Sequence, residues 1–330
     1  MSLKVFITRD IPSLGPDLLR QNGFDVTIWS EQRPMTQDEV IDAARKADIL
    51  LSLGENRLDS YFFSQCSHLK MVSQFAVGYD NINVTEATQL GIPVGNTPDV
   101  LAEATADIAF GLMIAVSRKF MFNYKRILDG NWGYFVPKAN LGQELNGKTL
   151  GIFGLGSIGM VMAQRSRGAY NMDIIYYNRT RNTDAEQKFG ARRVEFDELL
   201  AKSDVVSVHS VLSDETRGKF DKTAFSKMKP SAIFINTARG GVHNEQDLIE
   251  ALNNKIIWGA GLDVTNPEPM HKDNPLLFME NACVLPHIGS ATVEARDGMS
   301  RLAAENIISY FKDGTVPHCV NKEVLKKVKN

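Results

Sequence analysis

The feature that most constrains the fold is a repeated alternation of short β-rich runs with amphipathic helical stretches. This alternation is typical of parallel sheets, in which each strand returns to the sheet through a helix. A first series of expected strands covers residues 5–8, 26–29, 49–52, 71–74 and 93–95. A second series covers residues 149–153, 174–177, 205–208, 233–235, 257–260 and 284–285. The sequence therefore predicts an α/β protein with two doubly wound parallel-sheet units.

Length and charge agree with two domains and narrow the range of partners. The chain has 330 residues, and 37 basic against 39 acidic side chains give a net charge of −2. No broad positive field is expected to hold a nucleic acid or an anionic membrane. The longest strongly apolar run, residues 108–116, is shorter than the roughly 18 residues that a membrane span needs. The N-terminal segment lacks the apolar core of a signal peptide, so we expect a cytoplasmic protein.

Cysteines and histidines give no metal signature. Cys66, Cys283 and Cys319 show no CxxC spacing, and the six histidines form no HExxH pair. We expect buried, unpaired cysteines and no metal site. His243, His271 and His318 are interpreted as surface residues.

Several helix boundaries are visible in the sequence. Thr36 and Glu39 have the spacing of a capping box. Residues 101–120 are apolar around most of a helical circumference, which predicts one long buried helix. Apolar residues at helical spacing over 299–311 precede Gly314, a predicted helix C-cap.

A glycine-rich turn points to a dinucleotide. Gly154-Leu155-Gly156-Ser157-Ile158-Gly159 follows an expected strand and opens an expected helix. In this context the first glycine permits a tight turn, the second lets the pyrophosphate approach the backbone, and the third allows close packing of helix on strand. The positive end of the helix then faces the phosphates. The sequence predicts dinucleotide binding at this turn.

The loop after the next strand favours NADP(H). NAD binding by such a turn usually relies on an acidic residue about 20 positions further on, and none is present. The strand instead ends in Asn178-Arg179-Thr180-Arg181. Arginines at this place suit a 2′-phosphate through charge-assisted hydrogen bonds. A solvated basic loop is the alternative, and it would leave NAD(H) possible.

Three polar residues follow other expected strands. Arg239, Glu268 and His287 all lie in loops after strands, where doubly wound folds place their ligands. His209 follows the strand 205–208 and either lines the cofactor cleft or has a structural role. The aromatic residues Trp132, Tyr134 and Phe135 either wall a substrate pocket, in one interpretation across a dimer interface, or have only a packing role.

Several of these motifs together resemble the D-isomer-specific 2-hydroxyacid dehydrogenases. The resemblance covers nearly the whole chain and rests on GLGSIG, FINTARGG, AGLDVTNPEP and LPHIGSAT, and also on residues 75–80 and 104–107. It implies a Rossmann cofactor domain, residues 100–290, inserted in a flavodoxin-like substrate domain, residues 1–99 plus 291–330. NRTR is particularly similar to the glyoxylate and hydroxypyruvate reductase branch.

The resemblance also implies roles for individual residues. Arg239 would bind the carboxylate and keto oxygen of the substrate, His287 would be the acid/base, and Glu268 its partner. The backbone of Ala76, Val77 and Gly78 would hold the substrate carboxylate. The expected cofactor contacts are Thr105, Gly154, Gly156, Ser157, Ile158, Gly159, Asn178, Arg179, Thr180, Arg181, His209, Ala238, Asp263 and Gly289. The expected reaction is reduction of a small 2-keto acid to a 2-hydroxy acid by a homodimeric NAD(P)-dependent oxidoreductase.

The chemistry of the three polar residues agrees with this reaction. Hydride transfer to C2 of a keto acid develops negative charge on the carbonyl oxygen, so a positioned proton donor is needed. Histidine suits that task, and a neighbouring carboxylate stabilises its charged form. An arginine fork matches a carboxylate and stays charged.

Other functions stay open from the sequence. A cofactor-sensing protein similar to transcriptional corepressors is the alternative to an enzyme, because fold alone does not decide function. Within the enzymes, D-lactate, formate and phosphoglycerate dehydrogenases share the expected architecture.

Overall fold

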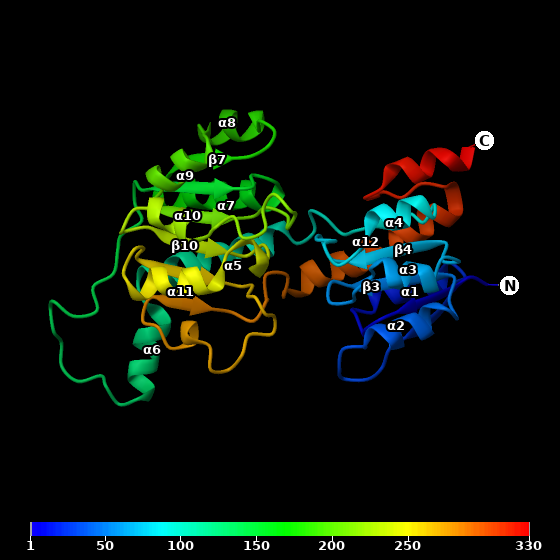
Figure 1. Cartoon of the computed structure of the whole chain (residues 1–330), viewed down its shortest axis with the longest axis horizontal. Helices are drawn as coiled ribbons and strands as arrows, with labels where there is room; N and C mark the ends of the chain where they lie inside the picture. The colour runs from blue at the N-terminus through cyan, green and yellow to red at the C-terminus, as the bar shows by residue number, and fades with distance from the viewer. Residues whose placement is uncertain (1, 330) are drawn as a thin grey trace. The chain divides into compact units, whose positions relative to one another are not determined.

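The computed structural model describes residues 2–329, and side chains over residues 2–325 (Figure 1). The chain divides into two compact units. Unit 1 comprises Met1–Leu101 with Ala291–Asn330, and unit 2 comprises Ala102–Ser290. Unit 2 is therefore an insertion between two segments that build unit 1.

Unit 1 contains a parallel sheet. Within its described residues the strand order is β2-β1-β3-β4-β5, with every neighbouring pair parallel. The strands are β1 (Lys4–Ile7), β2 (Asp25–Ile28), β3 (Ile49–Leu53), β4 (Met71–Phe75) and β5 (Val94–Gly95). The alternation of the first series therefore located these strands correctly to within about two residues.

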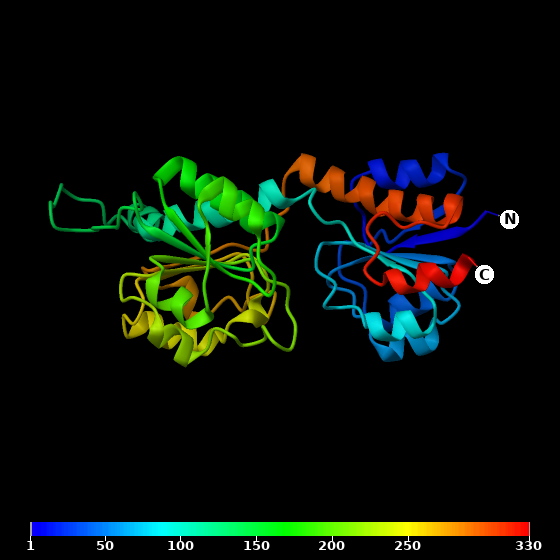
Figure 2. The same ribbon diagram turned by 90° about the horizontal axis from the view of Figure 1, so that it is seen from above.

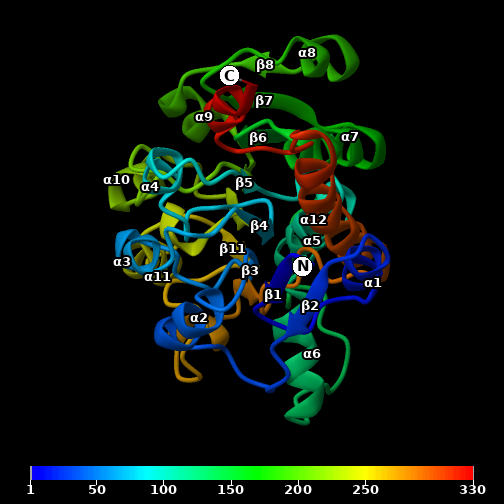
Figure 3. The same cartoon turned by 90° about the vertical axis from the view of Figure 1, so that its right-hand side faces the viewer.

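Helices cover both faces of this sheet (Figures 2 and 3). On one face lie α1 (Leu14–Gln21) and α12 (Val293–Asp313); on the other lie α2 (Gln37–Ala44), α3 (Ser60–Gln65) and α4 (Val84–Gln89). The short helix η3 (Lys322–Lys329) follows. Both predicted boundaries are confirmed: Thr36 and Glu39 form a capping box, and α12 ends at Gly314 with φ of 73°.

Unit 2 contains a longer parallel sheet. In the described chain its order is β12-β11-β10-β9-β6-β7-β8. The strands are β6 (Thr149–Phe153), β7 (Asp173–Tyr177), β8 (Arg192–Arg193), β9 (Val205–Val208), β10 (Ile233–Asn236), β11 (Gly259–Leu262) and β12 (Ala282–Val284). From β6 the chain builds outwards in one direction through β7 and then in the other through β9. Ligands bind such sheets at the carboxyl ends of the strands beside this reversal.

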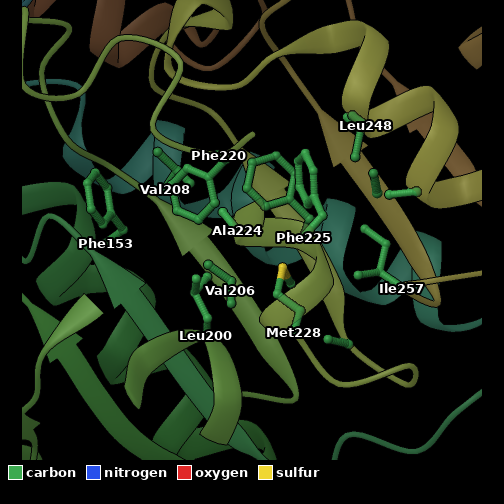
Figure 4. Packing of buried hydrophobic residues seen from close by; sticks show 14 of the residues in the cluster. Phe153, Leu200, Val206, Val208, Phe220, Ala224, Phe225, Met228, Leu248 and Ile257 are labelled. Atoms are coloured by element: carbon green, nitrogen blue, oxygen red, sulfur yellow. The ribbon is translucent and has the colours of Figure 1, made fainter. Parts of the chain in front are cut away.

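Helices again form two layers around the sheet of unit 2 (Figure 2). One layer contains α5 (Ala102–Ser117) and α7 (Ser157–Tyr170); the other contains α9 (Phe196–Lys202), α10 (Lys222–Lys227) and α11 (Glu245–Asn253). The remaining helices are α6 (Phe120–Leu128), α8 (Thr183–Phe189), and the short η1 (Gly240–Val242) and η2 (Pro275–Leu277). An aromatic cluster fills the space between the sheet and the second layer, with Phe220 in contact with Phe153 at a ring distance of 5.2 Å (Figure 4).

The predicted helix over residues 101–120 is confirmed over Ala102–Ser117 and is wrong only at its last three residues. Helix α5 ends at Ser117, and α6 begins at Phe120 after Lys119, whose φ is 53°. A left-handed residue cannot continue a right-handed helix, so the chain changes direction there. Helix α6 consequently leaves the core, and none of its residues is buried.

Two further expectations concern burial and membranes. Cys66, Cys283 and Cys319 are all buried and unpaired, as predicted. Within the described residues, no helix has the length and apolar character of a membrane span.

Candidate active site

The glycine-rich turn connects β6 to α7 in the geometry that its sequence predicts. Gly154 has φ of 95°, and a Cβ atom there would lie 2.6 Å from the backbone nitrogen of Ser210. A Cβ atom on Gly159 would lie 2.9 Å from the carbonyl oxygen of Gly154. Both glycines are therefore required by close backbone packing.

Gly156 has a different environment and marks the ligand side of the turn. A Cβ atom there would meet nothing within 4 Å, and Gly156, as N-cap of α7, offers no side chain to cap the helix. The open space lies at the positive end of a 14-residue helix. Because an anion can occupy this place and accept hydrogen bonds from the first turn, the residues present fit a dinucleotide pyrophosphate. Ser157 and Ile158, both predicted contacts, are the first two residues of that helix.

The NRTR loop is held in place by its own neighbours. Asn178 ties it to the glycine-rich turn, accepting a hydrogen bond from the backbone nitrogen of Leu155 at 3.1 Å. The guanidinium of Arg193 donates to the carbonyl oxygens of Asn178 and Arg179 at 2.9 and 3.1 Å. Arg193 therefore fixes the backbone that carries the predicted 2′-phosphate contacts.

The two predicted phosphate-binding arginines differ in their surroundings. Arg179 is exposed, as is Thr180 between the two arginines. Arg181 donates from Nε and Nη2 to the carboxylate of Glu186 at 2.7 Å. Hydrogen bonds from Arg181 and from Tyr176 hold the pKa of Glu186 below its usual range. Glu186 stays ionised and occupies one edge of the Arg181 fork.

His209 lies against the glycine-rich turn. A Cβ atom on Gly154 would meet the carbonyl carbon of His209 at 2.9 Å. The His209 ring contacts the Ser207 hydroxyl at 2.8 Å and the Thr237 hydroxyl at 3.5 Å. Burial lowers the pKa of His209 to about 4, so the ring is neutral near pH 7. Both of its predicted roles, at the cofactor turn and in a hydrogen-bonded structure, agree with this position.

Glu268 and His287 meet in unit 2. Glu268 Oε1 accepts a hydrogen bond from Nδ1 of His287. Partial burial alone would raise the pKa of the Glu268 carboxyl, but the hydrogen bond and charge of His287, the Thr265 N–H and the charge of Arg239 together lower it. The ionised carboxylate therefore fixes the proton of His287 on Nδ1, and this pairing does not involve Nε2.

The backbone after His287 is fixed by Asp263. The carboxylate of Asp263 accepts hydrogen bonds from the backbone nitrogens of Ile288 and Gly289 at 2.8 and 2.7 Å. The Thr105 hydroxyl donates to the carbonyl oxygen of Gly289 at 3.1 Å. His287 itself has φ of 54°, a left-handed conformation that costs a histidine free energy and is found at functional sites. Asp263 is 1% exposed, and burial raises its pKa although the two N–H groups oppose that effect.

Arg239 lies on the turn after β10 and belongs to the same cluster. It is half-buried, and its charge is felt at Glu268. Its Nη1 donates to the carbonyl oxygen of Ala238 at 2.8 Å. A Cβ atom on the next residue, Gly240, would lie 1.9 Å from the carbonyl oxygen of Thr265, so the arginine turn packs directly on the loop that carries Glu268. Unit 2 thus brings together Arg239, Glu268 and His287, which the sequence places far apart.

The loop of Ala76, Val77 and Gly78 follows β4 in unit 1. The three carbonyl oxygens accept hydrogen bonds, from the backbone nitrogen of Thr97 and from the side chains of Asn96 and Gln74. Because the C=O and N–H of a trans peptide point in opposite directions, the amide groups of the loop point away from these partners. Its role in holding the substrate carboxylate stays a prediction.

Two interpretations of the sequence are corrected by burial. His243 is 2% exposed and not a surface residue, because it follows η1 and packs its ring against Phe234 at 5.8 Å. His271 is exposed and His318 is half-buried. A packing role for the aromatic residues after α6 is not met within this single chain either: Trp132, Tyr134 and Phe135 are 76%, 86% and 87% exposed.

Sequence reasoning missed several residues that support the site. Asn236, Glu186 and Arg193 hold the loops of the predicted residues through side-chain hydrogen bonds. A signal was available for Asn236, which is the polar last residue of an apolar strand. Glu186 and Arg193 carried no comparable signal. In the described part of the chain, no group of histidine, cysteine or acidic side chains is arranged to hold a metal ion.

The fold and the site define a nicotinamide-dependent oxidoreductase: a dinucleotide-binding turn shares one unit with an arginine and a carboxylate-bound histidine. The profile of the D-isomer specific 2-hydroxyacid dehydrogenase NAD binding domain matches residues 110–289. The chain belongs to this family.

Known relatives are similar to this chain over nearly the whole length of both proteins. The chain is 42% identical to the glyoxylate reductase of Thermococcus litoralis over 329 residues, covering 98% of each chain. The solved glyoxylate reductase of Paecilomyes thermophila superposes with a TM-score of 0.87 at 32% identity, covering 98% of this chain and 99% of the other. An NADPH-dependent glyoxylate/hydroxypyruvate reductase of Sinorhizobium meliloti, solved with NADP and malonate, gives a TM-score of 0.83 at 29% identity, covering 97% of both chains.

Proposed function

We propose that the protein reduces small 2-keto acids, with glyoxylate and hydroxypyruvate as substrates, to D-2-hydroxy acids at the expense of NADPH. The observation that carries the proposal is the Arg239, Glu268 and His287 cluster in the unit that also holds the glycine-rich turn. Relatives named glyoxylate reductase and glyoxylate/hydroxypyruvate reductase support the substrate class.

His287 is the proton donor in this proposal. The bound reduced nicotinamide supplies the hydride that goes to C2 of the keto acid. His287 then gives the proton on Nε2 to the carbonyl oxygen as negative charge develops there. Glu268, kept ionised, stabilises the charged imidazolium before transfer and holds its ring in one orientation. The left-handed backbone of His287, and the hydrogen bonds from the backbone nitrogens of Ile288 and Gly289 to Asp263, fix the direction in which the imidazole faces the keto acid.

Arg239 binds the substrate carboxylate and keto oxygen. Its planar guanidinium matches the two carboxylate oxygens and keeps its charge at any physiological pH. A fixed positive charge also stabilises the developing alkoxide without reorganisation. The amides of Ala76, Val77 and Gly78 are proposed as further donors to the substrate carboxylate.

NADP(H) is proposed as the preferred nicotinamide cofactor. Arg179 and Arg181, on a loop fixed by Arg193, supply positive charge after β7, and no acidic residue occupies positions 178–181. The exposed Arg179 is proposed as the principal contact of the 2′-phosphate, because Arg181 already shares its fork with Glu186. NADH remains a usable but weaker cofactor.

A homodimer is proposed from the exposed apolar residues of α6 and the segment after it. The exposed large side chains are Phe120, Met121, Tyr124, Ile127, Leu128, Trp132, Tyr134, Phe135, Val136 and Leu141. Exposed apolar side chains concentrated on one segment are typical of an interaction site. A second copy suits it, because Lys125, Arg126 and Asp129 on the same segment provide charges of both signs for a two-fold contact. Sedimentation analysis of the wild type and a Trp132→Asp/Phe135→Asp variant tests this, and a monomeric wild type would refute it.

A cytoplasmic location stays a prediction.

The activity is tested with a panel of 2-keto acids assayed with NADPH and with NADH. Oxidation of NADPH with glyoxylate or hydroxypyruvate, and chiral analysis showing D-glycerate from hydroxypyruvate, are the expected results. The Arg239→Lys variant is the specificity control, because a point charge replaces the planar fork. Cofactor binding without turnover of any 2-keto acid would contradict the proposal.

A further inference from the structure

A buried asparagine controls the turn that presents Arg239. Asn236 is the last residue of β10 and is fully buried. Its Oδ1 accepts a hydrogen bond from the backbone nitrogen of Ala238 at 2.9 Å, and its Nδ2 donates to the carbonyl oxygen of Arg239 at 2.9 Å. One side-chain amide thus holds both ends of the Ala238–Arg239 segment.

The second N–H of the Asn236 amide reaches His243. Nδ2 lies 3.0 Å from Nδ1 of His243. The orientation of the amide is fixed by its other partners, because a backbone N–H must donate to oxygen and a carbonyl must accept from nitrogen. Nδ1 of His243 is therefore an acceptor, and the ring carries its proton on Nε2.

His243 is built to stay in that state. The ring packs edge-on against Phe234, and the backbone around His243 pairs with Phe220. Nε2 is buried without a hydrogen-bond partner in the described residues. Burial lowers the pKa of His243 to about 4, so the ring is neutral wherever the enzyme is expected to work. Because the neutral Nδ1 of His243 accepts a hydrogen bond from Nδ2, it favours the amide orientation of Asn236 over the one in which Oδ1 and Nδ2 exchange places.

The orientation of the Arg239 side chain depends on the same turn. Nη1 of Arg239 donates to the carbonyl oxygen of Ala238, in the segment that Asn236 holds. A shift of that segment therefore moves the guanidinium, and a displacement of about 1 Å at a binding group is enough to lower an enzyme's rate severely. Gly240, the residue after Arg239, has no room to move towards the neighbouring loop, because its backbone lies directly against Thr265.

We propose that Asn236 and His243 are positioning residues that set the guanidinium of Arg239 for the substrate carboxylate. This inference rests on the proposed function, in which Arg239 binds that carboxylate. Neither residue touches the substrate or the nicotinamide in this scheme. Their contribution passes through Arg239 and is specific to the keto acid.

Three variants test the chain of contacts. Asn236→Asp keeps the shape and the acceptor for Ala238 but removes the donors to Arg239 and His243. His243→Leu removes the acceptor, whereas His243→Asn places Oδ1 where Nδ1 stood and restores it. For Asn236→Asp and His243→Leu we expect the KM for the keto acid to rise about tenfold, with the KM for NADPH within about twofold of wild type. His243→Asn should restore the keto-acid KM.

A matched control exists in unit 1. Asn321 is 1% exposed, accepts from the backbone nitrogen of Val94 at 2.8 Å and donates to the carbonyl oxygen of Ile92 at 2.9 Å. Asn321→Asp makes the same chemical change in a similar backbone clamp. It should lower the melting temperature while leaving the keto-acid KM unchanged.

Arg239→Lys separates the inference from the proposed function. If Arg239→Lys leaves the keto-acid KM unchanged, the role of Arg239 in the proposed function fails. If Arg239→Lys raises this KM but Asn236→Asp does not, the inference is overturned while the proposed function stands. Equal damage from His243→Asn and His243→Leu, or equal rises in the KM for NADPH and for the keto acid, would also overturn it. Should Asn236→Asp not fold, the two His243 variants decide.

Discussion

Replacing the arginines of the NRTR loop should change cofactor preference without changing chemistry. NADPH and NADH differ only in the 2′-phosphate, so a residue that binds this group affects one cofactor and not the other. Arg179 is exposed, whereas Arg181 is paired with Glu186. We therefore expect unequal effects from Arg179→Ala and Arg181→Ala.

The magnitude follows from the hydrogen bonds that each arginine can give. A hydrogen bond to a charged group contributes about 1.5–3 kcal/mol, and exposure to solvent places this site at the lower end. Arg179→Ala should therefore raise the KM for NADPH about tenfold. Arg181→Ala should raise it less, because Nε and Nη2 already bind the Glu186 carboxylate. The double variant should raise it up to about a hundredfold, with the KM for NADH within about twofold.

Steady-state kinetics with both cofactors at several salt concentrations measure the effect. Salt screens exposed charges, so the KM for NADPH should rise with ionic strength in wild type and less in the double variant. Arg192→Ala is the matched control, because Arg192 lies on the neighbouring strand β8 but pairs with Glu198 at 2.8 Å. Glu186→Gln should lower the KM for NADPH, since it removes a negative charge beside Arg181. Parallel changes for NADPH and NADH in the double variant would refute the reasoning and identify the loop as merely solvated.

Three further predictions concern the acid/base pair and the buried histidine. His287→Ala should lower kcat about 10²- to 10⁴-fold while NADPH binding, followed by fluorescence titration, stays near wild type; equal loss of both would make His287 structural. Glu268→Gln should lower kcat for reduction, because a neutral amide replaces the carboxylate that accepts the Nδ1 proton and stabilises the charged imidazolium; an unchanged kcat would remove Glu268 from this role. The pKa of His243 falls from 6.5 to about 4 on folding, so its contribution to the free energy of unfolding is complete above pH 6.5 and is lost as the pH drops towards 4. This loss amounts to about 3 kcal/mol, and urea unfolding across that range should show a flatter pH dependence for His243→Asn than for wild type.

Strand positions and the glycine-rich turn were readable from the sequence because each depends on local pattern. A parallel strand that is buried on both faces needs a continuous apolar run. A turn that joins a strand to a helix beside a bound pyrophosphate needs glycines at fixed spacing. The break at Lys119 was not readable, because nothing in its side chain demands a positive φ. Strand β8, only two arginines long, also carries no pattern.

The position of the candidate residues after strands could be predicted from the sequence, but the contacts that hold their loops in place could not. Arg239, Glu268 and His287 each follow a strand, and position after a strand is visible in the sequence. The pairing of Arg181 with Glu186 depends on side-chain conformations, and so does the reach of Arg193 to the backbone of Arg179. His243 was misassigned because histidine is intermediate in its tendency to be buried, so residue type alone does not decide its burial. In the structure its buried ring has Asn236 as a partner.

These supporting contacts share one feature, a polar side chain at the end of a strand that binds the backbone of a loop. At the carboxyl ends of three strands of unit 2, a polar side chain binds the backbone of a loop with a proposed role: Asn178 after β7, Asn236 at the end of β10 and Asp263 after β11. The sheet ends there, so backbone groups that would pair within a strand are satisfied by an amide or a carboxylate instead. Each such contact contributes about 1 kcal/mol to folding, a small part of the stability of a unit this large. The same contact fixes a loop that must present its side chain within about half an ångström. Substitutions at these strand ends should consequently cost more in catalysis than in stability, whereas substitutions in the apolar strands behind them should show the reverse.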